Sequence, residues 1–85
     1  MEKPSIRITK EINYFDAKNW LIETGKVTDV QEDKVWDWMC DYLCITNDSS
    51  HSNPFSEDID DPDIAAFSKA FVEEFPDADH IYVSW

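Results

Sequence analysis

The stretch that decides the fold is Thr28–Ile45, TDVQEDKVWDWMCDYLCI, because it carries two helical patterns at once. Val35, Met39 and Leu43 recur every four residues, which predicts the core-facing stripe of an amphipathic helix. Three neighbouring side chains belong to the same predicted stripe: Trp36, Cys40 and Tyr42. The stretch therefore predicts a long helix that packs on the rest of the chain.

Four aspartates repeat at the same spacing on the other side of this predicted helix. They are Asp29, Asp33, Asp37 and Asp41, and we call them the aspartate ridge. A helix rises about 1.5 Å per residue, so neighbouring members stand roughly 6 Å apart along the axis. Each like-charged pair costs about 0.2–0.5 kcal/mol, and Lys34 is expected to offset Asp37 only in part. We interpret the ridge as a surface kept for a positively charged partner.

The negative charge is concentrated in one part of the chain. Nineteen acidic and seven basic residues give a net charge of −12 over 85 residues. Residues 1–28 hold four acids and five bases (+1), whereas residues 29–79 hold fifteen acids and two bases (−13). Such a surface repels nucleic acid and anionic membranes and attracts a basic protein. A purely solubilising surface is the alternative interpretation.

The other segments predict one small α+β domain over residues 1–85 with the order β-α-α-α-β. Residues 5–9 and 80–85 alternate apolar and polar side chains, which predicts two half-buried strands. Residues 46–60 show neither period, so we expect a long mobile loop there. The predicted architecture is a small sheet of two strands, or three if another segment joins, with three helices packed on it.

Capping residues mark the ends of the first and third predicted helices, over residues 14–24 and 62–75. Asn13 is the expected N-cap of the first helix, and Gly25, the sole glycine, suits the left-handed position after its end. Asp61 and Pro62 are the expected N-cap and first residue of the third helix. The predicted buried stripe of that helix is Ile64, Phe67, Phe71, Val72 and Phe75.

The second helix has two possible capping boxes at its start. Thr28 and Gln31 fit the pattern, in which each side chain bonds to the backbone of the other residue. Asp29 and Glu32 fit the same pattern one residue later. The sequence leaves both alternatives open.

One tryptophan and two further acidic blocks complete the predicted partner-binding surface. Trp20 and Trp36 are expected in the core, and Trp85 is the last residue and difficult to bury. Trp38 lies beside the ridge, where an arginine would pair with carboxylates and stack on the indole; the alternative is that it closes the core. The acidic blocks are Glu57, Asp58, Asp60 and Asp63, followed by Glu73, Glu74 and Asp77.

Other chemistry finds little support in the sequence. Cys40 and Cys44 have a spacing that zinc sites allow, but free cysteines are more often packed in cores. Residues 57–63 are acidic but lack the glycine and glutamate positions of a calcium-binding loop. His51 and His80 stand alone, and no catalytic motif is present. We therefore expect no enzyme activity, no cofactor and no metal.

The sequence also carries no predicted membrane span and no signal peptide, so we expect a cytoplasmic protein. In size, charge and patterning, the chain resembles the small acidic proteins that phages use against restriction and CRISPR systems. This resemblance implies an inhibitor encoded by a phage or mobile element. It would bind the basic nucleic-acid-binding surface of a defence nuclease or CRISPR/restriction complex by DNA mimicry, in the host bacterial cytoplasm.

Two other functions fit the same features. An immunity protein or antitoxin that neutralises a basic nuclease toxin would also be small, acidic and fast-binding. The predicted element order and the Trp36–Asp37 pair are similar to those of barstar-like inhibitors. A non-inhibitory acidic adaptor domain inside a larger assembly is the third possibility. The oligomeric state of the protein does not follow from the sequence.

Overall fold

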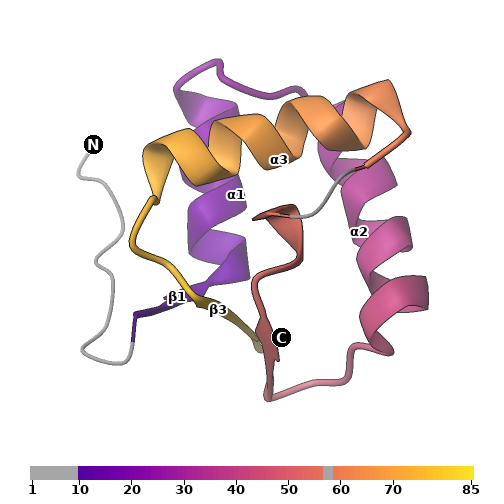
Figure 1. The fold of residues 1–85 in the computed structure, drawn as a ribbon, viewed down its shortest axis with the longest axis vertical. Helices are drawn as coiled ribbons and strands as arrows, with labels where there is room; N and C mark the ends of the chain where they lie inside the picture. Colours follow the sequence, from indigo (N-terminus) through magenta and orange to yellow (C-terminus); the bar gives the residue numbers. More distant parts are fainter. Residues whose placement is uncertain (1–9, 57–58) are drawn as a thin grey trace.

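The computed structural model describes residues 10–56 and 59–85 of the chain and confirms the α+β class. Within these residues, the chain forms three helices and a three-stranded mixed sheet, in the order β-α-α-β-α-β (Figure 1). The elements are β1 (Glu11–Asn13), α1 (Tyr14–Glu23), α2 (Asp29–Leu43), β2 (Ser49–Ser52), the short 3-10 helix η1 (Pro54–Ser56), α3 (Pro62–Glu74) and β3 (His80–Val83).

The C-terminal strand β3 is the middle strand of the sheet, whose order is β1-β3-β2. It runs parallel to β1, with Ile81 opposite Ile12, and antiparallel to β2, with Ile81 opposite His51. The strand predicted for residues 80–85 is thus confirmed over His80–Val83. The strand predicted for residues 5–9 lies outside the described residues.

The prediction that residues 46–60 form a loop without secondary structure is wrong. Ser49–Ser52 form β2, and η1 follows directly. The segment SSHS contains no apolar residue, and none of its side chains is fully buried, so a search for alternating hydrophobicity finds no strand there. β2 exists because it pairs with β3 along the edge of the sheet.

The capping contacts confirm both predicted ends of α1 and one of the two capping boxes that the sequence allows at the start of α2. The Asn13 side chain accepts hydrogen bonds from the backbone at the start of α1, and Gly25 has a left-handed φ of 74° after its end. At the start of α2, the Thr28 hydroxyl accepts from Gln31 N, while Gln31 Oε1 accepts from Thr28 N. Thr28, rather than Asp29, therefore caps α2.

The start of α3 also matches its prediction. Asp61 Oδ1 accepts hydrogen bonds from the backbone nitrogens of Asp63 at 2.9 Å and Ile64 at 3.3 Å. Pro62 occupies the first helical position, where its missing N–H costs nothing. The helix ends at Glu74, and Phe75 follows before Pro76.

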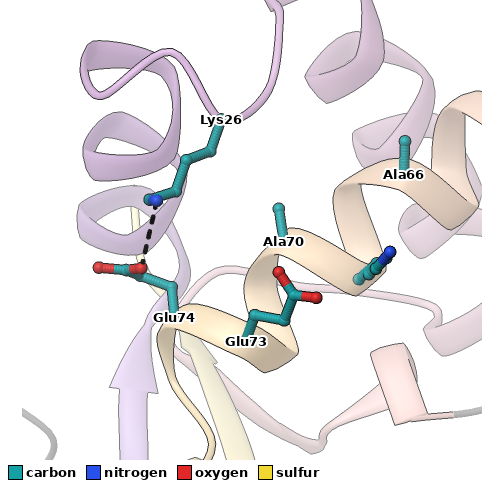
Figure 2. A pocket seen from close by; sticks show the side chains of 6 residues that line it. Lys26, Ala66, Ala70, Glu73 and Glu74 are labelled. Atoms are coloured by element: carbon teal, nitrogen blue, oxygen red, sulfur yellow. Dashed lines mark ion pairs between the residues drawn. The ribbon is translucent and has the colours of Figure 1, made fainter.

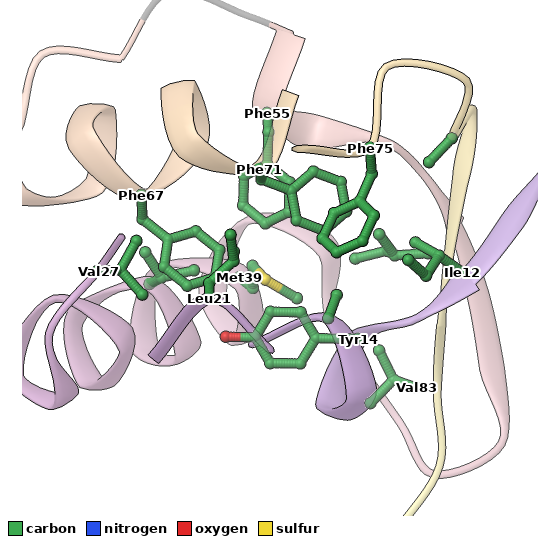
Figure 3. Close-up of a cluster of buried hydrophobic side chains, with 14 of the residues drawn as sticks. Ile12, Tyr14, Leu21, Val27, Met39, Phe55, Phe67, Phe71, Phe75 and Val83 are labelled. Atoms are coloured by element: carbon green, nitrogen blue, oxygen red, sulfur yellow. The ribbon is translucent and has the colours of Figure 1, made fainter. Parts of the chain in front are cut away.

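Aromatic side chains dominate the core, as Figure 3 shows. Phe55, Phe67, Phe71 and Phe75 cluster with Tyr14, and the ring centroids of Phe55 and Phe71 lie 4.6 Å apart. α2 contributes its two fully buried residues: Val35 and Met39. Large rings compensate for the small size of the chain, because each removes roughly 150–250 Å² from water.

The prediction that Tyr42 and Val72 are buried in the apolar stripes is wrong. Tyr42 is 53% exposed and Val72 is 37% exposed. Tyr42 lies in the last turn of α2, and Figure 1 shows that this end of α2 extends past α3. Val72 lies roughly 60° around the helix axis from Phe75, at the edge of the buried face. Trp20 and Trp36 are partly buried and pack against the core.

Candidate partner-binding surface

All four members of the aspartate ridge are exposed on α2. Four residues turn a helix by about 400°, so each aspartate is displaced by roughly 40° from the previous one. The ridge is therefore a slanting row that runs along about 18 Å of the helix axis. The opposite face of α2, with Val35 and Met39, is anchored in the core. Core packing thus keeps the ridge pointed toward solvent.

Lys34 lies on α2 close to the ridge but binds a carboxylate of another helix. Its ammonium is 2.6 Å from Asp63 Oδ2 at the start of α3. This hydrogen bond raises the pKa of Lys34 and lowers the pKa of Asp63, and their opposite charges add to both shifts. Lys34 therefore pairs with Asp63 of α3 and not with Asp37 of the ridge.

The other ion pairs of the described residues do not include a ridge aspartate either. Lys18 is 3.7 Å from Glu32, and Lys26 is 3.7 Å from Glu74. No ion pair in residues 10–56 and 59–85 joins a lysine to a ridge aspartate. The ridge thus keeps its four carboxylates without an internal counter-charge from this part of the chain.

The two other acidic blocks differ in how far their carboxylates are engaged. Asp60, Glu73 and Asp77 are exposed, whereas Asp63 binds Lys34. Glu74 accepts a hydrogen bond from Trp20 Nε1 at 2.8 Å in addition to its ion pair, so it also holds α3 against α1. Glu57 and Asp58 lie outside the described residues.

A shallow pocket lies between α3, which carries Glu73 and Glu74 of the second block, and the connection between α1 and α2. Its volume is about 350 Å³, and Figure 2 shows Lys26 and Glu74 pairing across one side of it. Its lining combines two lysines, two glutamates and two alanines: Lys26, Lys69, Glu73, Glu74, Ala66 and Ala70. The opposite charges on its walls balance, so the pocket favours neither an anion nor a cation.

Partly exposed aromatic side chains lie on both flanks of the ridge. On one flank, Trp38 stacks on Tyr42, with ring centroids 5.4 Å apart and planes 10° apart. On the other, Trp36 meets the edge of Trp85, which is 65% exposed. The sequence predicts Trp38 for the partner-binding surface but places Tyr42 in the buried stripe. The four-residue spacing of the two rings, which places them side by side on a helix, is the signal that could have identified Tyr42.

The cysteines and histidines do not gather into a reactive site. Cys40 is half-buried, and burial followed by the charge of Asp37 raises the pKa of its thiol. Cys44 is exposed at the end of α2, so core packing applies at most to Cys40. His51 Nε2 lies 2.8 Å from Ser49 Oγ within β2. In the described residues, no three metal-ligating side chains form a group that could hold an ion.

No known protein family, curated protein or solved structure matches this chain significantly. Among the described residues, none of the helices has both the length and the apolar character needed to cross a bilayer.

Proposed function

We propose that this protein is a small acidic inhibitor that occupies the basic nucleic-acid-binding surface of another protein. The observation that carries the proposal is the aspartate ridge, which is fully displayed on α2 and has no described lysine paired with it. A helix that carries three like-charged neighbouring pairs loses roughly 0.2–0.5 kcal/mol for each. Binding to a positively charged surface would offset this cost.

The spacing of the ridge supports mimicry of a nucleic acid strand. Phosphates along one DNA strand rise about 3.4 Å per step along the axis, and the path through the backbone is longer. Carboxylates at roughly 6 Å intervals on a rigid helix present a comparable row of negative charge. A defence nuclease or a CRISPR or restriction complex has the basic groove that such a row would fit.

The charge of the whole molecule supports rapid capture of such a partner. A protein with a net charge of −12 attracts a basic surface from a distance, and this raises the association rate at low salt. Screening shortens the range of this attraction to about 8 Å at physiological ionic strength. The proposal therefore includes association that slows steeply as salt is added.

The decisive test pairs a double charge reversal on the ridge with a matched control. Asp33→Lys with Asp37→Lys should abolish inhibition while the protein stays folded, because both side chains are exposed. Asp16→Lys with Glu23→Lys changes the net charge equally on the exposed surface of α1, and it should preserve inhibition. The readout is the DNA binding of an effector recovered with the wild-type protein, measured after each variant is added.

The outcomes separate the proposal from its alternatives. If both double variants inhibit equally well at low salt, the ridge is not the binding site. If the recovered effector is a nuclease toxin encoded beside this protein, the function is that of an immunity protein. If wild-type protein binds an effector without displacing its DNA, the protein is an adaptor and the inhibitor proposal is wrong.

A further inference from the structure

The stacked pair of Trp38 and Tyr42 forms a flat aromatic surface on the C-terminal half of α2. The two rings are nearly parallel, with 10° between their planes, and Tyr42 exposes 53% of its surface. Because they stand one turn apart on a rigid helix, a partner can contact them as a single unit. Tyrosine and tryptophan are the residues most enriched at protein interfaces, together with arginine.

The core supports this stack from behind. Trp38 is half-buried, and its ring centroid lies 6.1 Å from that of Phe55 in η1. Phe55 is buried and packs in turn on Phe71 of α3. A partner that binds the stack therefore does not have to order Trp38 first, which lowers the entropy cost of association.

The charges around the stack on its own helix favour a cation. Asp41 lies three residues after Trp38, so it borders the Trp38 ring on the helix surface. Lys34 lies one turn before Trp38, but its ammonium is held by Asp63 at 2.6 Å. Across from α2, η1 contributes the uncharged Phe55, and the start of α3 contributes Asp63. A cation over Trp38 would thus meet the Asp41 carboxylate at the edge of the ring.

We propose that the Trp38–Tyr42 stack is a docking platform for arginine side chains of the partner protein, next to the aspartate ridge. This inference rests on the proposed function and specifies the chemistry of the partner's contact. A guanidinium is planar and weakly hydrated, so it stacks on aromatic rings while its N–H groups bind carboxylates. The lysine ammonium is compact and strongly hydrated, so it gains less from the rings.

Two short peptides of equal length, one oligoarginine and one oligolysine, test this inference directly. Their affinities for the full-length protein should be measured by titration calorimetry at about 0.15 M ionic strength, where distant charges are screened. The arginine peptide should bind about two- to fivefold more tightly for each ring contact. Tyr42→Leu should reduce this preference to the share contributed by the remaining Trp38 ring, and Tyr42→Phe, which keeps both rings, should retain it in full. Circular dichroism verifies that both variants are folded.

Each outcome distinguishes the inference from the function on which it rests. Equal affinity for both peptides would overturn the arginine platform, and a preference that Tyr42→Leu leaves undiminished would show that arginine binds elsewhere. The ridge is tested separately by Asp33→Lys with Asp37→Lys, which should weaken both peptides. If neither peptide binds the wild-type protein, the acidic surface does not capture cations, and both proposals are wrong.

Discussion

At the scale of single residues, Tyr14 has the clearest structural role. Its side chain is fully buried, yet its hydroxyl donates a hydrogen bond of 2.8 Å to Glu32 Oε2 on α2. Glu32 Oε1 lies 3.7 Å from the Lys18 ammonium on α1. These contacts tie α1 to the inner side of α2. Burial, followed by the charge of Glu32, raises the pKa of Tyr14 far above its ordinary value of 10.0.

Tyr14→Phe should lower the free energy of unfolding near pH 7 by about 1–3 kcal/mol, because Glu32 loses a charge-assisted hydrogen bond. The raised pKa adds a pH dependence. The unfolded state releases the Tyr14 proton above about pH 10 and the folded state retains it, so this contribution to stability is lost as pH rises. In urea unfolding, the difference in unfolding free energy between wild type and Tyr14→Phe should be smaller at about pH 11 than at pH 7.

The exposed Tyr42 provides the control for this prediction. Tyr42→Phe should lower the unfolding free energy near pH 7 by less than Tyr14→Phe does, because water can replace the hydrogen bonds of a hydroxyl on an exposed side chain. Parallel loss of stability by wild type and Tyr14→Phe above pH 10 would contradict the assignment of this titration to Tyr14.

At the scale of elements, α2 determines what the molecule presents to a partner. Its N-terminus is set by the capping box of Thr28 and Gln31, whose two hydrogen bonds measure 3.2 Å and 3.0 Å. Its inner face is anchored by Val35 and Met39. The rotation of the ridge relative to the core follows from these local and packing contacts together. Disturbing the cap should therefore affect the first turn of α2 before the rest.

Thr28→Ala should lower the free energy of unfolding by about 0.5–2 kcal/mol, because the backbone N–H of Gln31 loses its partner. Asp29→Ala should cost less, since Asp29 only interacts with the helix dipole and also repels Asp33. Thr28→Ser preserves the hydroxyl and serves as the control. The melting temperatures of the three variants test this assignment. If Asp29→Ala lowered the melting temperature most, Thr28 would not be the cap.

At the scale of the whole molecule, repulsion among the acidic residues opposes folding. The net charge is −12, and none of the three ion pairs described within residues 10–56 and 59–85 includes a ridge aspartate. Such repulsion is long-ranged at low ionic strength and is screened within about 10 Å at 0.1 M salt. Added salt should therefore stabilise the free protein, whereas it should weaken partner binding.

Added salt should raise the free energy of unfolding of the wild-type protein, as measured by urea unfolding at several ionic strengths. Asp33→Lys with Asp37→Lys should be at least as stable as wild type at low salt. It converts two repulsive pairs into attractive ones, each worth about 0.2–0.5 kcal/mol, and keeps one repulsive pair. A wild-type protein destabilised by screening, or a double variant that unfolds more readily, would show that ridge repulsion is not significant.

The sequence by itself determined the three helices and the C-terminal strand. These predictions succeeded because their signals are local: Asn13, Thr28 and Asp61 bond to backbone groups two or three residues away, and Gly25 takes a left-handed conformation. The periods of apolar residues identified most of the core. The exposure of the aspartate ridge followed from the same periodicity, since the opposite face of α2 had to be buried.

Only the tertiary structure decided the features that depend on contacts between distant segments. β2 forms because β3 offers it a partner, and Lys34 turns from Asp37 to Asp63 because α3 begins beside it. Tyr42 lies where the periodicity predicts burial, but α2 extends past α3 at this end, and Tyr42 is 53% exposed. A local pattern can indicate which face of a helix is apolar. How far along the helix that face is covered depends on where the other elements end.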